Sequence, residues 1–194
     1  MKETIILNQE SVSVQHLIQK DKRLAKLISL VGDIKYSPQS DGHSFLVHEI
    51  IEQMLSIKAG NQIYERLLSI CSGNITPESI NELSVSDIKG AGTSTAKAEY
   101  IKLLTTSVMN QVLDLQKLHE LDDSSVINEF TKLRGIGAWT AKMYLIFVLN
   151  RSNVLPYEDG AFLQTYKWLY KTTDCSKIYK SKMQKMGTLC FHCR

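Results

Sequence analysis

The stretch that decides the fold is Leu133-Arg134-Gly135-Ile136-Gly137-Ala138-Trp139-Thr140-Ala141-Lys142. An apolar helical pattern over 126–133 runs into it, and a second helical pattern begins directly after the glycines. Glycine permits positive φ and lets another part of the backbone approach closely. The N–H groups that open the second helix carry partial positive charge and suit a phosphate oxygen without any side chain. The stretch therefore predicts either a plain turn between helices or an anion-binding hairpin. The residues of that hairpin are Gly135, Ile136, Gly137, Ala138 and Thr140.

The composition sets broad limits on the protein. A chain of 194 residues fits one compact domain, or two small lobes that share a core. The hydrophobic fraction of 43% and the charged fraction of 22% exclude a disordered chain. The net charge of +3 permits a nucleic-acid partner without requiring one. No targeting signal and no apolar run of ~18 residues occurs, so we expect no membrane partner and a cytoplasmic location, at the nucleoid if the source is prokaryotic.

Helical periodicity dominates the chain and predicts an all-α fold of about ten short helices. Ser44 is expected to cap the helix over 45–56, and Thr76 with Pro77 marks another helix start. Further helices are predicted at 96–109, 123–133, 139–149 and 159–170. No segment alternates cleanly with period two. The segments 90–97 and 135–142 share the pattern G-x-G-x-x-T-A-K, which marks a glycine turn that leads into a helix.

Three more motifs accompany the hairpin in a fixed order. Gln53-Met54-Leu55-Ser56 ends an early helix. The second motif is Gly90-Ala91-Gly92-x-Ser94-x-x-Lys97-x-x-Tyr100-Ile101. After the hairpin, a loop with Val154-Leu155-Pro156 leads to Asp159 at the start of a new helix. Over about 21–170 the chain resembles the helix-hairpin-helix DNA glycosylases, closest to their 3-methyladenine (AlkA-type) branch. The resemblance implies a single glycosylase domain over 1–194, folded as two lobes with the active site between them.

The resemblance also implies a reaction and places Asp159 in the catalytic position. Alkylated purines such as 3-methyladenine are flipped out of double-stranded DNA, and the N-glycosidic bond is hydrolysed. A carboxylate near the anomeric carbon stabilises the positive charge that builds up on the sugar and orients the attacking water. The alternative is that Asp159 only caps its helix, since aspartate is favoured there in any protein. The neighbouring Glu158 is expected to contact solvent.

Trp139 predicts the reaction subtype. Bifunctional relatives carry a lysine nucleophile at this hairpin position, whereas Lys142 lies about one helical turn further on. The chain is therefore expected to remove bases without cutting the strand. Some relatives hold an iron–sulfur cluster on four cysteines spaced six, two and five residues apart. The four cysteines here (Cys71, Cys175, Cys190, Cys193) do not match, so no cofactor and no iron–sulfur cluster are expected.

The resemblance assigns further roles to side chains and to backbone carbonyls. Met54 or Leu55 would insert into the space that the flipped nucleotide leaves, and Met54 is the preferred candidate. The alternative is that Met54 is a buried residue of the core. Trp139, Tyr144 and Tyr157 are candidates to stack on the extruded base. The family hairpin holds a monovalent cation through carbonyls, which would fall at Thr131, Leu133 and Ile136. A bulky β-branched residue at Gly137 is expected to disrupt the turn.

The last residues depart from the family pattern. The chain ends Met186-Gly187-Thr188-Leu189-Cys190-Phe191-His192-Cys193-Arg194, where relatives continue through a Trp-x-Pro-Tyr segment. With synonymous codons chosen freely at several of these positions, the same bases read one base further on can encode Trp-Glu-Pro-Tyr-Ala-Ser-Ile-Ala, and Met-Gly alone forces the tryptophan. The tail over 186–194 is therefore interpreted as an out-of-frame product that impairs stability and activity. The clustered Cys190, His192 and Cys193 would make a poor metal site without a distant fourth ligand.

Two other functions fit the same motifs. One is a glycosylase for another damaged or mispaired base. The other is a DNA-binding protein without activity, in which the hairpin binds phosphates and the altered C-terminus leaves the pocket inactive. The expected partner in each case is double-stranded DNA, bound by a monomer.

Overall fold

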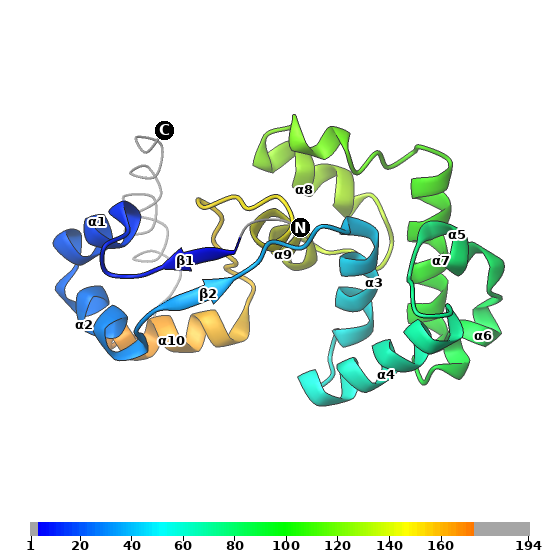
Figure 1. Cartoon of the computed structure of the whole chain (residues 1–194), viewed down its shortest axis with the longest axis horizontal. Coiled ribbons are helices and arrows are strands. Elements are labelled where there is room, and N and C mark those ends of the chain that lie inside the picture. Colours follow the sequence, from blue (N-terminus) through cyan, green and yellow to red (C-terminus); the bar gives the residue numbers. More distant parts are fainter. Residues whose placement is uncertain (1–3, 173–194) are drawn as a thin grey trace. The chain divides into compact units, whose positions relative to one another are not determined.

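The computed structural model describes residues 4–172, and helices dominate them. Ten α-helices, one short 3-10 helix and two short strands follow one another along this part of the chain (Figure 1). The predicted all-α class is confirmed, although the small two-stranded ribbon was not expected. None of the helices within residues 4–172 is long and apolar enough to cross a membrane. The tail of Met186–Arg194 lies outside the described residues, so its interpretation as an out-of-frame product stays a prediction.

The described part of the chain divides into two compact units, and the first joins residues 4–38 to residues 150–172. Its strands β1 (Ile5–Leu7) and β2 (Ile34–Tyr36) pair antiparallel, with Ile6 opposite Lys35. Its helices are α1 (Val12–Lys20), α2 (Lys22–Val31) and α10 (Gly160–Tyr170). Residues near the two ends of the described chain thus fold together.

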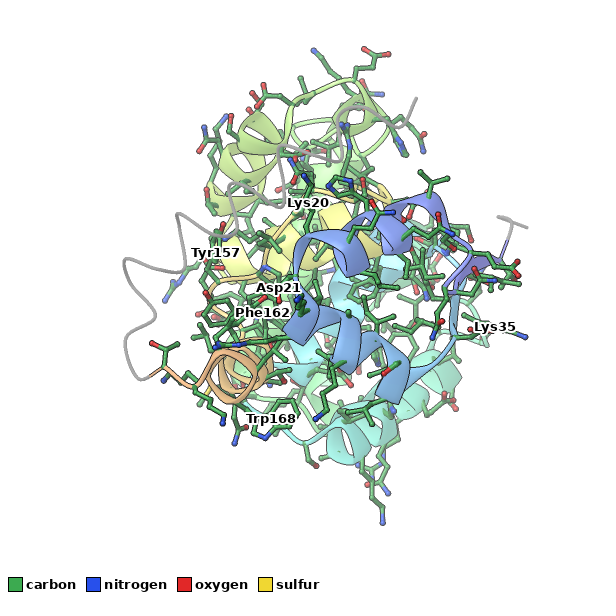
Figure 2. All side chains as sticks on the ribbon, turned by 90° about the vertical axis from the view of Figure 1, so that its left-hand side faces the viewer. Lys20, Asp21, Lys35, Tyr157, Phe162 and Trp168 are labelled. Carbon is green, nitrogen blue, oxygen red and sulfur yellow. The ribbon has the colours of Figure 1, made fainter. Side chains whose placement is uncertain are left out.

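Helices α2 and α10 pack against each other and are joined by hydrogen bonds. The Tyr170 hydroxyl donates to Asp21 Oδ2 at 2.8 Å, and Arg23 donates to the Tyr170 carbonyl at 3.0 Å. Tyr166 and Tyr170 are buried, and Tyr157 and Phe162 pack against them. Figure 2 labels Tyr157 and Phe162 together with Asp21, the N-cap residue of α2. These contacts fix α10, and with it the residues that begin this helix.

The second unit spans residues 39–149 and contains the remaining helices. Helix α3 runs through its middle and packs against α4, α7 and α9 (Figure 1). The bounds of these helices are α3 Gly42–Glu52, α4 Ile57–Ile70, α5 Pro77–Glu82, α6 Val85–Gly90, α7 Thr95–Met109, η1 Lys117–His119, α8 Asp123–Thr131 and α9 Ala138–Phe147. Large apolar side chains of α3 (Leu46, Ile50 and Ile51) are completely buried, so this helix forms the centre of the core.

Most helix starts in the second unit are capped by a short polar side chain. The predicted start at Thr76 and Pro77 is confirmed, and the Thr76 hydroxyl accepts from the Ser79 amide at 3.1 Å. The expected cap at Ser44 is wrong. Helix α3 begins three residues earlier than its apolar pattern suggests, and Asp41 accepts from the Ser44 amide at 3.0 Å. Ser44 instead pairs through its hydroxyl with Tyr64 at 2.6 Å.

Two ionisable side chains of α3 are buried in the second unit. His43 pairs with the Thr105 hydroxyl at 3.0 Å, and burial lowers the pKa of this imidazole to about 4. Glu49 is nine-tenths buried, and its Oε2 has no hydrogen-bond partner. Burial, and secondly the charge of Glu52, raise the pKa of the Glu49 carboxyl from an ordinary value of 4.5 to about 7. Between pH values of about 4 and 7, the fold thus favours the neutral form of both the His43 imidazole and the Glu49 carboxyl.

We predict that Glu49 makes the protein less stable as the pH rises. A carboxyl with a raised pKa in the folded state contributes stability that is complete below 4.5 and is lost as the pH passes about 7. Glu49→Gln removes this dependence, so it should match wild type near pH 4 and exceed it near pH 8 by on the order of 2 kcal/mol. Urea unfolding at several pH values measures the difference, with the exposed Glu99→Gln as the control. Parallel pH profiles for wild type and Glu49→Gln would contradict the prediction.

Candidate active site

The predicted hairpin lies between α8 and α9 and is tightly turned. The Leu133 amide donates to the Phe130 carbonyl at 3.0 Å, and the Ile136 amide donates to the Leu133 carbonyl at 3.1 Å. Gly135 has a φ of +96°, a conformation that side chains rarely adopt. A Cβ at this position would also collide with the ring of Tyr100 on α7. Residue 135 must therefore be glycine for two independent reasons.

Gly137 has a different role from Gly135. Its φ of −95° is ordinary, and a Cβ here would meet nothing within 4 Å. The position thus has room for a methyl group, and the expectation that a bulky β-branched residue disrupts the turn stays a prediction. Gly137 is the N-cap of α9 and provides no side-chain cap to the first turn. The side chains of Ile136 and Thr140 are buried, so the hairpin offers a bound anion its backbone amides rather than these side chains.

A side chain from α3 holds the hairpin in place. Gln53 is the C-cap of α3, and its side-chain amide donates to the Gly135 carbonyl at 2.9 Å. Lys97 of α7 in turn donates to the Gln53 carbonyl at 2.6 Å. The motif that contains Gln53 thus contacts the hairpin directly, and the motif that contains Lys97 contacts Gln53.

Met54 follows Gln53 directly and is completely exposed, with a φ of +59°. The alternative that Met54 is a buried core residue is therefore wrong. Leu55 is about half-exposed, so both side chains proposed for insertion into DNA lie at the surface. A large apolar side chain held outward on a left-handed residue suits insertion between bases.

Asp159 begins α10 and caps it. Its Oδ1 accepts the Phe162 amide at 2.6 Å, and the side chain is half-buried. The capping alternative is thus correct as a description of the contact. It does not account for the charge, because asparagine caps a helix as well as aspartate does. The catalytic role of Asp159 stays a prediction at this point.

The three aromatic candidates lie in different surroundings. Tyr144 is buried in the core, with its ring edge-on to Phe45 and Phe130 at centroid distances of 6.1 and 4.7 Å. This packing leaves no open face for a base, so Tyr144 has a structural role instead of the predicted one. Trp139, in the first turn of α9, and Tyr157, beside the Tyr166–Tyr170 cluster, are half-buried. These two remain candidates for stacking.

The possible cation site of the hairpin involves backbone only. The backbone carbonyl oxygens of Thr131, Leu133 and Ile136 are hard ligands of the kind that coordinate monovalent cations. The three residues lie close together in the sequence, around the turn at Gly135. The Leu133 carbonyl already accepts the Ile136 amide, and a carbonyl has a second lone pair for a metal. These residues therefore fit the cation, whose presence stays a prediction.

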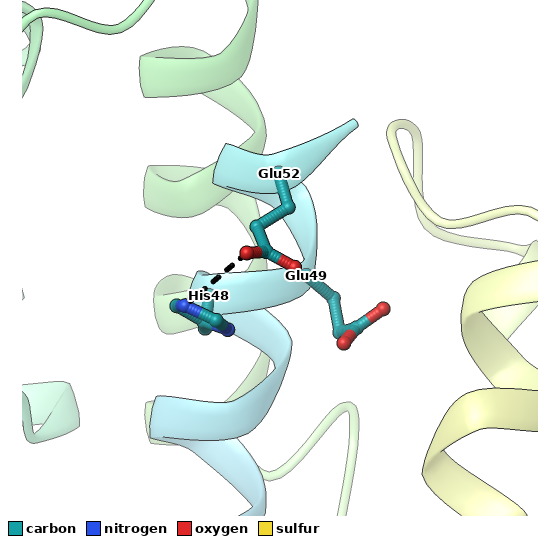
Figure 3. Close-up of side chains that lie close together, drawn as sticks. All are labelled: His48, Glu49 and Glu52. Carbon is teal, nitrogen blue, oxygen red and sulfur yellow. Dashed lines mark ion pairs between the residues drawn. The ribbon is translucent and has the colours of Figure 1, made fainter. Parts of the chain in front are cut away.

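A second group with metal-binding residue types lies on α3. Ligand atoms of His48, Glu49 and Glu52 lie within 4.8 Å of one another. Figure 3 shows that Glu52 turns toward His48, at 3.7 Å, while the Glu49 carboxylate points away from both. The His48 ring also pairs with Asn61 at 3.0 Å. We interpret the group as a partly exposed contact between His48 and Glu52 beside the buried Glu49 carboxyl, not as a metal centre.

Of the four cysteines, Cys71 is buried in the second unit. The others, including the cluster of Cys190, His192 and Cys193, lie outside the described residues. The expectation that the chain carries no iron–sulfur cluster therefore continues to rest on the cysteine spacing.

Comparison with known proteins decides the family. The model of the HhH-GPD superfamily base excision DNA repair proteins matches residues 47–188, which include the hairpin and Asp159. The chain belongs to this superfamily.

Individual relatives agree with that assignment. The crystal structure of a DNA-3-methyladenine glycosidase from Bacillus halodurans aligns with a TM-score of 0.81 at 33% identity, over 92% of this chain and 85% of that one. The 3-methyladenine DNA glycosylase of Schizosaccharomyces pombe, solved in complex with abasic DNA, aligns with a TM-score of 0.81 at 27% identity, over 91% and 89% of the two chains. In sequence, DNA-3-methyladenine glycosylase 1 of the same yeast is 29% identical over 178 residues, covering 88% of this chain and 77% of its own.

We predict that the two hairpin glycines differ sharply in their tolerance of a methyl group. Gly135→Ala should unfold more easily, by at least ~1 kcal/mol for the left-handed conformation alone, and should weaken DNA binding because the Tyr100 ring must move. Gly137→Ala is the matched control and should lose less stability, because its Cβ meets nothing and alanine in place of glycine at an N-cap costs roughly 1 kcal/mol or less. Thermal unfolding and fluorescence anisotropy with a duplex oligonucleotide measure the two effects. Equal stability of the two variants would show that the contact with Tyr100 does not constrain the turn.

Proposed function

We propose that this protein is a monofunctional DNA glycosylase that removes alkylated purines, such as 3-methyladenine, from double-stranded DNA. The observation that carries the proposal is the combination of a glycine hairpin, whose helix lacks a side-chain cap, with an aspartate of the following helix. Both occur within the segment that matches the HhH-GPD superfamily. The names of the relatives supply the substrate class.

DNA binding in this proposal depends mainly on the backbone. Phosphate oxygens lie against the first-turn amides of α9, where the helix dipole favours negative charge. Such contacts position the duplex without reading its sequence. A monovalent cation at the carbonyls of Thr131, Leu133 and Ile136 would add positive charge beside the same phosphates. The partner is double-stranded DNA with a damaged base, bound by one copy of the chain.

Flipping the nucleotide requires something to fill the space that it leaves. Unstacking a base costs a few kcal/mol, and less when the base is damaged. Met54 projects from the surface on a backbone that holds it outward, so it replaces part of the lost stacking. Trp139 or Tyr157 stacks its aromatic ring on the extruded base, an interaction that any purine can make through its flat face.

Bond cleavage then requires a charge held in place. As the N-glycosidic bond breaks, positive charge develops on the sugar, and the Asp159 carboxylate stabilises it and orients the attacking water. The Phe162 amide fixes the direction of this carboxylate before the substrate binds. The water oxygen bonds to the anomeric carbon, the base leaves with the electron pair of the N-glycosidic bond, and one proton of the water is released, so an abasic sugar remains. The strand itself is not cut.

Asp159→Asn should abolish release of 3-methyladenine while DNA binding persists. Asparagine keeps the oxygen that caps α10 but carries no charge, so the fold is preserved and the transition state loses its partner. We expect at least a ~100-fold loss in the single-turnover rate, with Glu158→Gln as the neighbouring control. A rate for Asp159→Asn within a few-fold of wild type would rule out the assignment. Duplex binding without base release by wild type would favour a DNA-binding protein that has no activity.

The product should be an intact abasic site. Trp139 occupies the position of the lysine nucleophile, so no Schiff base can form there, and borohydride should trap no protein–DNA adduct. Denaturing gels of the reaction before and after alkali treatment distinguish base removal from strand cleavage. An adduct that disappears in Lys142→Met would show instead that the lysine three residues further along α9 acts as a nucleophile.

A further inference from the structure

The C-terminal end of α3 carries two parts of the proposed binding surface in consecutive residues. Gln53 donates its side-chain amide to the Gly135 carbonyl of the hairpin at 2.9 Å. Met54, the next residue, is fully exposed and takes a left-handed conformation that methionine disfavours. The position of the methionine and the position of the hairpin therefore both depend on where α3 ends.

One side chain from α7 holds that end. The Lys97 ammonium donates to the Ile51 carbonyl at 2.8 Å and to the Gln53 carbonyl at 2.6 Å. The last carbonyls of a helix have no partner within it and lie at the negative end of its dipole, so a cation is well suited to them. Burial lowers the pKa of Lys97, as expected for an ammonium enclosed by backbone.

The bond to the Gln53 carbonyl matters most, because that carbonyl belongs to the peptide unit joining Gln53 to Met54. Fixing this oxygen fixes the orientation of the peptide plane from which the Met54 backbone continues. The Leu55 amide, on the far side of Met54, donates to the Glu52 carbonyl at 2.9 Å. Met54 is thus held between two hydrogen-bonded neighbours, although its own side chain is exposed.

We propose that Lys97 is a positioning residue for nucleotide flipping, which sets the direction of Met54 and keeps it in register with the hairpin through Gln53. This inference rests on the proposed function, because it takes Met54 as the residue that enters the DNA. Lys97 itself need not touch DNA. Its ammonium is engaged with α3, and its removal affects the duplex through Met54 and Gly135.

The same helix provides a matched control. Lys102 also lies on α7 and donates to the carbonyls of Ile80, Asn81 and Leu83 at 3.3, 3.0 and 2.9 Å. It therefore caps the end of α5 in the way that Lys97 caps the end of α3. Removing either ammonium leaves carbonyls at a helix end without their cation. Of the two, only Lys97 is bonded to the residue that precedes Met54.

The test compares Lys97→Met with Lys102→Met in the full chain. The probe is a duplex with a tetrahydrofuran abasic analogue beside a 2-aminopurine, whose fluorescence rises when it unstacks. We expect Lys97→Met to lose most of the fluorescence rise and to bind this duplex about tenfold more weakly, a difference near 1.4 kcal/mol. Binding to an undamaged duplex should change by less than about threefold, because the phosphate contacts remain. Lys102→Met should match wild type in every one of these measurements.

A double-mutant cycle shows whether Lys97 acts through Met54. In a Met54→Ala background, Lys97→Met should have little additional effect on the fluorescence rise, since the inserted side chain is already absent. For 3-methyladenine release, Lys97→Met should lower kcat more than it raises KM. Lys97→Gln, which keeps one donor for the carbonyls, should fall between wild type and Lys97→Met, and it serves in place of the methionine variant if that one does not fold.

The outcomes separate this inference from the proposed function. A wild-type protein that binds the probe duplex and raises its fluorescence, beside a Lys97→Met variant that does the same, overturns the role of Lys97 alone. Equal losses in Lys97→Met and Lys102→Met would show a general effect on stability and would also overturn it. A wild-type protein that neither binds the probe nor unstacks it contradicts the proposed function, and with it the role assigned to Lys97.

Discussion

The close approach of Gly135 to the ring of Tyr100 is the contact on which the hairpin depends. No side chain fits between that backbone and the ring, so the turn after α8 lies directly against α7. The Arg134 guanidinium lies 5.7 Å from the centre of the same ring and adds a cation–π contact. On the other side, Gln53 binds the Gly135 carbonyl. Segments near residues 53, 100 and 135 are therefore held together by one small residue.

The two glycine turns of the second unit show how similar sequences come to serve different purposes. The shared pattern aligns Gly90 with Gly135, but the backbone aligns Gly92 with Gly135, since these are the residues with φ of +110° and +96°. Two residues after Gly92, Ser94 caps α7, and its hydroxyl accepts a hydrogen bond from the Lys97 amide. At α9 the corresponding cap is Gly137, without a side chain. Helix α7 thus caps its own first turn and supports its neighbours, whereas the first turn of α9 has no side-chain cap, as the proposed contact with a DNA phosphate requires.

The sequence predicted most of the helices because their starts are marked locally. Thr76 with Pro77 is such a mark, and so is the glycine hairpin before α9. The ribbon of β1 and β2 was missed because strands of three residues are too short to show an alternation of apolar and polar side chains. Ser44 was mistaken for a cap because Asp41, the true cap, precedes the first apolar residue by several positions.

The errors at the site have a different origin, namely that periodicity does not show what a residue faces. Tyr144 lies on a helix that is apolar on most of its sides, and only the packing against Phe45 and Phe130 shows that it belongs to the core. Met54 looked equally suited to the core and to the surface. Lys97 carries no local signal of its role, because the carbonyls that it binds are 44 and 46 residues away in the sequence. Contacts of this kind require the folded chain.

The placing of Asp159 gives the proposed chemistry its physical basis. A carboxylate on a flexible loop would have to be oriented by the substrate, at a cost in binding energy. Here the first turn of α10 orients it, because the Phe162 amide holds one oxygen at 2.6 Å, and α10 is itself fixed to α2 by the contacts of Tyr170 with Asp21 and Arg23. A charge fixed in advance stabilises a developing positive charge without reorganisation during the reaction. The capping bond, which by itself indicates only a helix start, thus becomes the reason why this aspartate is suited to catalysis.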